Sequence, residues 1–294
     1  MRNIDRRTFI RSALVGAGAL ALPSWSGGSL DTLVAAPAAG CSATDMVTLG
    51  SSGIVTSRLA VGSGTHGVRK SSNQTRLGLD KFVGLIRHGF ERGVTFWDMA
   101  DQYGSHPCYR EALKHVPREK VVILTKSTTR DAAGMKADIE RFRRELDTDV
   151  IDILLLHSLM DPGWTAKMQA TMDVVSEARE QGVLRTFGVS CHDLGALKAA
   201  VASDWVEVIL ARINHAGAAM DGSPEVVAPV LREAHDKGKG IIGMKLAGAG
   251  RIRDQLSESL SYVLSLGSVD AFTMGFESTA ELDDFCDKVA ALGA

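Results

Sequence analysis

The sequence predicts an α/β chain folded as one (β/α)8 TIM barrel, with a small β-hairpin in front of the barrel. Short apolar runs alternate with amphipathic stretches, and the connections between them are short. Such alternation implies parallel strands, and eight strand–helix units close into a barrel of about 250 residues. An open doubly wound sheet is the alternative, but no G-x-G-x-x-G turn follows the first strand.

The predicted elements follow one another along the chain without a long gap. Strands over 46–49 and 54–57 flank Gly50-Ser51-Ser52-Gly53, whose glycines favour a hairpin turn. Eight apolar runs predict the barrel strands, over 59–62, 94–97, 121–125, 151–156, 185–189, 206–213, 240–244 and 269–274. Apolar residues at helical spacing predict helices over 79–92, 134–146, 167–181, 193–202, 225–237, 254–266 and 279–291.

Composition and charge exclude several classes of protein. Of the 294 residues, 45% are hydrophobic and 23% charged, and the net charge of −2 disfavours a nucleic-acid-binding surface. No apolar run is long enough to cross a membrane, so no span is expected in the mature chain. The four cysteines are single and form no C-x-x-C pair, which predicts neither a metal site nor an iron–sulfur cluster.

The first 44 residues are expected to be a signal peptide and linker, leaving 45–294 as the barrel domain. Arg6 and Arg7 precede a small apolar stretch over 12–23, a pattern typical of twin-arginine export. The expected partner is therefore the twin-arginine machinery, and the expected location is periplasmic or otherwise extracytoplasmic. Ala36-Pro37-Ala38 is the favoured cleavage site, and lipidation at Cys41 is the alternative.

Three single polar residues each close one of the apolar runs. Asp98 follows 94–97, Lys126 follows 121–125 and His157 follows 151–156. Tyr103 comes within a turn of Asp98. Because the carboxyl ends of barrel strands share one face, these four side chains are expected in one pocket.

These four groups suit the reduction of a carbonyl by hydride transfer. Tyr103 would donate the proton. Lys126 is expected to lower the pKa of the Tyr103 phenol from its ordinary value of about 10. Asp98 would keep the buried lysine charged, and His157 would bind the carbonyl oxygen. Each residue alone is also compatible with a structural role, but their combination at successive strand ends favours chemistry.

On these residues the chain resembles the aldo-keto reductases. The segment Asp98-Met99-Ala100-Asp101-Gln102-Tyr103-Gly104 is similar to the family's D-x-A-x-x-Y-G motif, and the runs ending in Lys126 and His157 resemble its lysine and histidine strands. The resemblance extends from the hairpin to the last helix. It implies a catalytic tetrad of Asp98, Tyr103, Lys126 and His157, with Tyr103 as general acid. It also implies NAD or NADP as cofactor and a small carbonyl compound as substrate.

The resemblance places the cofactor at the remaining strand ends. The implied contacts are Gly64, Thr65, Ser190, Asn214, Lys245, Leu246, Gly248, Gly250, Arg251, Gly275 and Glu277. Cys191 stands where the family has an asparagine that binds the carboxamide, and a thiol cannot replace both amide functions. The glycines after the seventh strand would admit a pyrophosphate, with Lys245 and Arg251 supplying charge.

Glu277 departs most clearly from the family. Relatives carry a base there that faces the 2′-phosphate of NADP, whereas a carboxylate repels phosphate and can accept hydrogen bonds from a ribose diol. The sequence therefore predicts NADH preference or weak NADPH binding, unless Glu277 only caps the last helix. An exported barrel with a binding or regulatory role and little turnover is the alternative to an enzyme.

Overall fold

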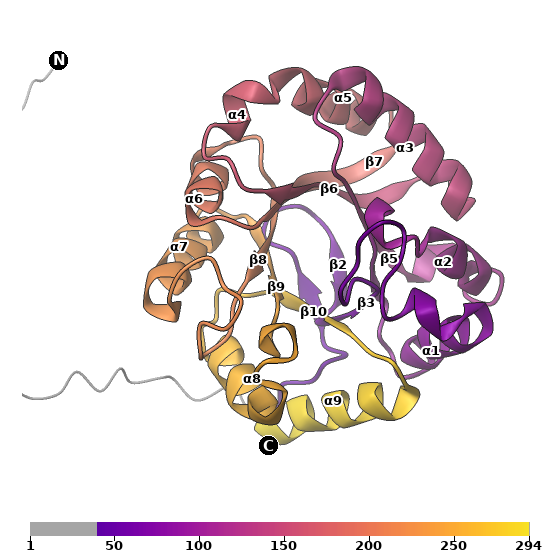
Figure 1. Ribbon diagram of the computed structural model, residues 1–294, viewed down its shortest axis with the longest axis vertical. Helices are drawn as coiled ribbons and strands as arrows, with labels where there is room; N and C mark the ends of the chain where they lie inside the picture. Colours follow the sequence, from indigo (N-terminus) through magenta and orange to yellow (C-terminus); the bar gives the residue numbers. More distant parts are fainter. Residues whose placement is uncertain (1–39, 294) are drawn as a thin grey trace, which may run out of the picture. The chain divides into compact units, whose positions relative to one another are not determined.

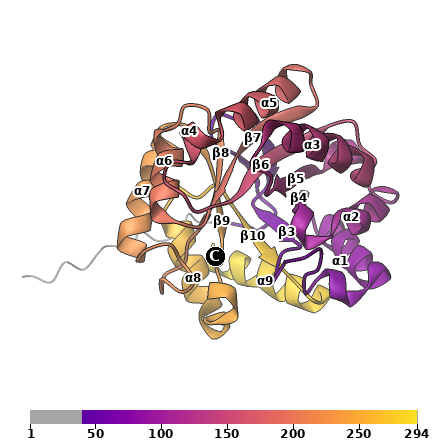
Figure 2. The ribbon, with the colours of Figure 1, turned by 45° about the horizontal axis from the view of Figure 1, so that its top comes forward.

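The computed structural model describes residues 40–293, so the predicted export signal and its cleavage site lie outside the described residues. The described part forms a closed barrel of eight parallel strands in the order β10-β3-β4-β5-β6-β7-β8-β9, with the helices outside it (Figure 1). A second view shows the same ring of helices around the strands (Figure 2). The predicted (β/α)8 barrel is confirmed.

The elements agree closely with the predicted order. The strands are β1 (Met46–Thr48), β2 (Val55–Ser57), β3 (Leu59–Gly62), β4 (Phe96–Asp98), β5 (Val122–Ser127), β6 (Ile151–Leu159), β7 (Leu184–Cys191), β8 (Val208–Arg212), β9 (Gly240–Met244) and β10 (Ala271–Gly275). The α-helices are α1 (Leu79–Glu91), α2 (His106–Leu113), α3 (Ala132–Leu146), α4 (Trp164–Lys167), α5 (Gln169–Glu180), α6 (Leu194–Ala202), α7 (Pro224–Asp236), α8 (Leu256–Ser265) and α9 (Thr279–Leu292).

Two helical regions differ from the sequence prediction. Helix α2 was not predicted, because its eight residues bury one short apolar side and offer little periodicity. The helix expected over 167–181 is divided at Met168, which ends α4 and precedes α5 with non-helical backbone angles. Among residues 40–293, no helix combines the length and apolarity that a membrane crossing requires.

The hairpin closes the amino-terminal end of the barrel. Strands β1 and β2 pair antiparallel, as predicted. Leu49 and Ile54, on either side of the turn, are fully buried among the side chains of the barrel interior. The turn is fixed to the chain before β9, where Ser51 N donates to Gly238 O at 2.7 Å. The opposite end of the barrel is therefore the end at which the polar strand-end residues lie.

The interior side chains explain why the site forms at that end. Inward-facing residues of the apolar layer include Ala60, Phe96, Leu124, Leu155, Leu210, Ile242 and Ala271. Side chains of a strand return to the same face every second residue, so the next inward position lies two residues further along each strand. Those positions are Gly62, Asp98, Lys126, His157, Arg212, Met244 and Thr273. A layer in which five of these seven side chains are polar thus lies directly above the apolar one, at the mouth of the barrel.

Candidate active site

A buried ion pair forms the floor of the site. Lys126 Nζ bonds Asp98 Oδ1 and also donates to Met99 O at 2.9 Å. The second carboxylate oxygen, Asp98 Oδ2, accepts a hydrogen bond from Thr273 Oγ1 at 2.7 Å. Only 1% of the Lys126 side chain and 8% of the Asp98 side chain are exposed. Burial lowers the pKa of Lys126 and the Asp98 charge opposes this, so the carboxylate has the charge-preserving effect expected of it.

Tyr103 and His157 meet above this ion pair. The Tyr103 hydroxyl lies 3.3 Å from His157 Nε2, and Lys126 Nζ lies 5.2 Å from the centroid of the tyrosine ring. Tyr103 is carried by a 3-10 turn over Asp101–Tyr103 that Gly104 ends with a left-handed φ of 67°. A Cβ atom on Gly64 would overlap the tyrosine ring, so the loop after β3 needs glycine there to admit it. The structure thus brings the four predicted side chains together.

The expected pKa of Tyr103 is corrected by the structure. We expected the neighbouring ammonium to lower the pKa of the phenol, but burial raises it and the Asp98 carboxylate raises it further. The reason is that Lys126 is already paired with Asp98, so the phenol meets a nearly neutral pair in a poorly solvated place. Tyr103 therefore holds its proton firmly at neutral pH.

His157 is neutral for a related reason. Burial lowers its pKa well below the ordinary value, and the charges of Lys126, Arg130 and Lys245 lower it further. Within residues 40–293, His157 Nδ1 is buried without a hydrogen-bond partner. The imidazole therefore offers one donor and one acceptor rather than a positive charge.

A cavity of about 420 Å³ opens beside these residues. Asp98, Tyr103 and Lys126 line it. Six of the predicted cofactor residues line the same cavity, namely Gly64, Thr65, Lys245, Gly250, Gly275 and Glu277. The strand-end arrangement therefore places three of the predicted tetrad residues in one cavity with six of the eleven predicted cofactor residues.

Five other predicted cofactor residues do not line this cavity. Ser190 Oγ accepts from Ser158 N at 3.2 Å, and the Asn214 amide donates to Ala218 O at 2.8 Å and to Lys245 O at 3.0 Å. Both side chains thus fix local backbone. Leu246 and Gly248 are buried, and Arg251 is exposed.

Sequence reasoning missed several residues of the site. Thr273 bonds Asp98, and the apolar Leu210 and Met244 form part of the cavity wall. Arg212 donates to His192 Nδ1 at 2.7 Å and pairs with Asp221 at 2.9 Å. The two-residue repeat of a strand would have identified Thr273 and Arg212, because each lies two residues after an inward-facing apolar residue of its strand.

An ion-pair network supports the turn that carries Tyr103. Asp101, His106 and Glu145 lie close enough together to hold a metal ion. However, Arg141 already bonds Asp101 at 2.6 Å and Glu145 at 2.9 Å. His106 joins Glu145 at 2.6 Å and Thr125 at 2.8 Å. The Arg141 guanidinium therefore occupies the place that a metal ion would take, and the cluster links α3 to the turn that carries Tyr103.

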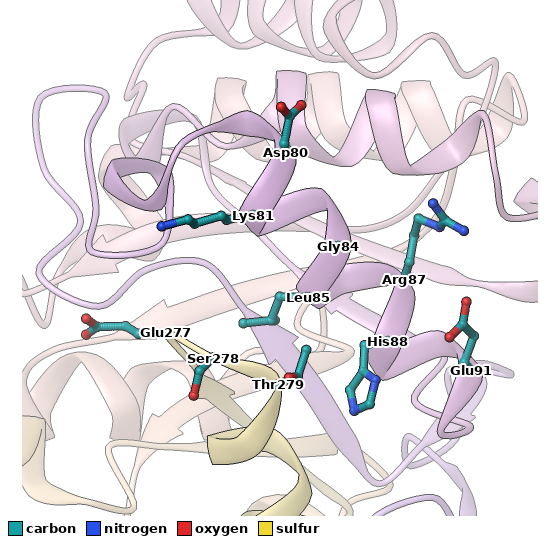
Figure 3. A pocket seen from close by; sticks show the side chains of 10 residues that line it. All are labelled: Asp80, Lys81, Gly84, Leu85, Arg87, His88, Glu91, Glu277, Ser278 and Thr279. Atoms are coloured by element: carbon teal, nitrogen blue, oxygen red, sulfur yellow. The ribbon is translucent and has the colours of Figure 1, made fainter.

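A larger cavity of about 540 Å³ lies outside the barrel mouth. It runs between α1 and the start of α9, with Glu277 at one end and Glu91 at the other (Figure 3). Its lining mixes acidic and basic side chains and includes no tetrad residue. We place the chemistry in the smaller cavity, because only that cavity contains the buried ion pair and the phenol.

Comparison with known proteins identifies the relationship. The model of the Aldo/keto reductase family matches residues 59–287. The chain belongs to this family. This aldo/keto reductase is 26% identical over 132 residues to methylglyoxal reductase DkgB of Salmonella typhi. The match covers 44% of the chain and 49% of that protein. The chain spans about half the length of the curated relatives it matches.

Solved structures confirm the fold of this aldo/keto reductase. A protein assigned as an aldo-keto reductase of Pseudomonas aeruginosa superimposes with a TM-score of 0.71 at 19% identity, covering 86% of this chain and 97% of that one. An aldo/keto reductase of Klebsiella pneumoniae in complex with NADP and acetate gives a TM-score of 0.65 at 18% identity, covering 83% and 90%.

Proposed function

We propose that this aldo/keto reductase is an NAD(P)H-dependent oxidoreductase that reduces an aldehyde or ketone to an alcohol, with Tyr103 as general acid. The observation that carries the proposal is the meeting of Tyr103 and His157 above the buried Lys126–Asp98 pair. The family match, the relative named a methylglyoxal reductase and the neighbour that binds NADP support it. The assembled tetrad disfavours the alternative of a binding barrel with little turnover.

The geometry gives each residue a definite task. A bound nicotinamide would supply the hydride. The Tyr103 hydroxyl and His157 Nε2 are 3.3 Å apart, so a carbonyl oxygen placed against both could accept a hydrogen bond from each. Tyr103 would then release its proton to that oxygen. The Lys126 ammonium, 5.2 Å from the centroid of the ring, would face the phenolate that remains.

The residues of the cavity fit a dinucleotide at its pyrophosphate end. Gly250 has a φ of 90° with open space where a Cβ would lie, so the turn over 248–250 leaves room for a close approach. Arg253 lines the same wall and supplies positive charge. At the nicotinamide end, Leu210 and Met244 present an apolar surface to the ring. Asn214 is engaged with its own loop, so we assign it no carboxamide contact.

We infer that the protein prefers NADH, because Glu277 lines the part of the cavity expected to hold the adenosine ribose. Glu277 Oε1 accepts a hydrogen bond from Asn73 at 2.6 Å on the cavity wall. Glu281 lies beside it, accepting from Glu277 N at 2.8 Å. Arg253 lies 3.9 Å from Glu281 and offsets its charge, whereas Glu277 has no ion-pair partner among the described residues. The Glu277 carboxylate would repel the 2′-phosphate of NADPH and can accept a hydrogen bond from a free ribose hydroxyl.

Both parts of the proposal are tested with one set of measurements. The native protein is examined by absorbance and mass for bound nicotinamide, and a panel of carbonyl compounds is then assayed with each cofactor. We expect turnover with tighter binding of NADH by fluorescence titration, and the variant Glu277→Lys should shift the preference towards NADPH about tenfold or more. A clear NADPH preference of the unaltered protein would defeat the argument from Glu277.

The pH dependence of reduction should lack the two usual limbs. Burial raises the pKa of Tyr103 above its ordinary value, so the acid stays protonated as the pH rises. Burial lowers the pKa of His157, so it stays neutral as the pH falls. We expect neither group to contribute a limb to kcat/KM for reduction of a neutral substrate between about pH 6.5 and about pH 9.5. Burial lowers the pKa of Lys126, so its deprotonation is the expected source of any alkaline limb. A limb in the acidic half of this range would show that His157 is more basic than this.

We also propose export by the twin-arginine pathway with cleavage after the Ala36-Pro37-Ala38 segment. Cleavage is favoured over lipidation because Cys41 is buried against the outer core and Gly40 N donates to Gly293 O at 2.5 Å. A lipid on that thiol would require this segment to leave the barrel. The double variant Arg6→Lys/Arg7→Lys should remain in the cytoplasm on cell fractionation, whereas Arg11→Lys should be exported. Equal export of both variants would refute the proposal.

A further inference from the structure

One side of the barrel mouth is built from cationic and imidazole side chains on neighbouring strands. Arg212 ends β8 and pairs in register with Met244 of β9, and Lys245 follows Met244 directly. His192 follows β7, the neighbour of β8 on its other side. The His192 ring lies 6.3 Å from the His157 ring, centroid to centroid. His192 therefore lies near one of the two groups that would bind a carbonyl oxygen, and Lys245 lines the cavity beside them.

The positive charges on this side outnumber the negative ones. Asp98 balances Lys126, and Asp221, with only 5% of its side chain exposed, balances Arg212. Within residues 40–293, the Lys245 ammonium has neither an ion-pair nor a hydrogen-bond partner. Arg130 reaches only the carbonyl oxygens of Thr129 and His157. Asp193, which caps α6 through Ala196 N, keeps its negative charge and contacts neither of these two cations. Lys245 and Arg130 are thus positive charges without a carboxylate partner among the described residues.

Lys245 is held towards the reacting groups by its backbone. Its φ of 63° lies in the left-handed region, which is unfavourable for a lysine and is typical of functional positions. Asn214 Nδ2 fixes this conformation by donating to Lys245 O at 3.0 Å. The Lys245 side chain lines the cavity that contains Asp98, Tyr103 and Lys126. Burial lowers the pKa of Lys245, and the positive charges of Arg212 and Lys126 lower it further, so the three cations interact with one another.

The two histidines do not add to the charge but can add a donor. Burial and the Arg212 charge lower the pKa of His192 to about 3, so it is neutral. Its Nδ1 accepts from Arg212 at 2.7 Å, which places the ring proton on Nε2. This end of the site therefore offers the Lys245 ammonium on the cavity wall and an N–H donor on His192, next to a guanidinium that Asp221 already pairs. An ammonium and an N–H donor suit an anionic oxygen group.

We infer that the carbonyl substrate carries an anionic group, a carboxylate or a phosphate, which Lys245 binds beside the Arg212–His192 pair. The inference rests on the proposed reductase function and names the substrate class within it. The lysine serves the substrate end of the cavity, while the turn over 248–250 and Arg253 serve the cofactor. The neutral parent compound would leave the half-buried Lys245 charge without a partner and would therefore bind less well.

The test compares matched substrates of different charge. Succinic semialdehyde is compared with its methyl ester, and glyceraldehyde 3-phosphate with glyceraldehyde, in the unaltered protein and in Lys245→Met. We expect the unaltered protein to favour one anion over its neutral match in kcat/KM, and the pair that responds identifies carboxylate or phosphate. In Lys245→Met this ratio should fall about tenfold to a hundredfold. The ratio removes any effect of the substitution on cofactor binding, because both substrates share it.

The matched control is Lys198→Met, which removes the same charge from an exposed position on α6. It should leave the ratio unchanged. Calorimetric binding of succinate and of inorganic phosphate to the unaltered protein and to Lys245→Met gives a second readout that needs no turnover. Equal kcat/KM for anionic and neutral substrates would overturn the inference while leaving the reductase function intact. So would an unchanged ratio in Lys245→Met accompanied by weaker NADH binding. Absence of any carbonyl turnover, with succinate or phosphate binding that depends on Lys245, would refute the reductase function instead.

Discussion

Replacing Tyr103 by phenylalanine should lower carbonyl reduction by about 100-fold to about 10,000-fold, the usual contribution of a positioned general acid. The variant keeps the ring that packs against Gly64 and loses only the hydroxyl that meets His157 at 3.3 Å. No other hydroxyl that the structure describes lies against both His157 and the Lys126–Asp98 pair. The measurement is kcat/KM for reduction of an active aldehyde.

Cofactor binding should survive this change, because the phenol is not expected to contact the dinucleotide's phosphates. A fluorescence titration with NADH checks it. Tyr262→Phe is the matched control, since Tyr262 lies on α8 in the outer ring and its loss of a hydroxyl should not alter turnover. Unchanged turnover in Tyr103→Phe would remove Tyr103 from its role as acid.

Replacing Lys126 by methionine should destabilise the fold as well as abolish activity. The substitution leaves the Asp98 carboxylate, 8% exposed, without its charged partner. Breaking a buried ion pair from one side costs about 3 to about 5 kcal/mol, because one desolvated charge remains. Unfolding in urea should therefore show a lower midpoint with an unchanged slope.

The double variant Asp98→Asn/Lys126→Met separates stability from chemistry. With both charges removed, most of the lost stability should return, since neutral replacements of a buried pair are nearly neutral in free energy. The amide can still accept the hydrogen bond from Thr273. Activity should stay absent. A double variant as unstable as Lys126→Met would show that the loss comes from packing of the lysine stem instead.

The fold was predictable because each level of the sequence indicates the same structure. Apolar runs, helical periodicity and the glycine turn all agree with a barrel preceded by a hairpin, and every barrel strand was expected close to where it lies. The exceptions are short or irregular. Helix α2 contains only eight residues, and the break at Met168 depends on backbone angles that no periodicity reveals.

The meeting of the four predicted side chains was predictable for the same reason, whereas other contacts in the cavity were not. Asp98, Lys126 and His157 stand out because a polar residue ending an apolar run is unusual. By contrast, the pKa of Tyr103 depends on burial, which only the assembled fold determines. Ser190 and Asn214 were expected from resemblance, yet their side chains bond neighbouring backbone groups. The positive surplus around Lys245 arises from three strands brought together in space.

The hairpin closes the lower end of the barrel, so reactants would enter from the opposite end. Leu49 and Ile54 fill the lower end beneath the apolar layer, so the cavity above that layer opens at the mouth of the barrel. Under the proposed function, cofactor and substrate both enter through this mouth, and the one that binds deeper is covered by the other. The molecule that binds deeper must bind first and leave last. Steady-state kinetics should therefore show an ordered binding sequence.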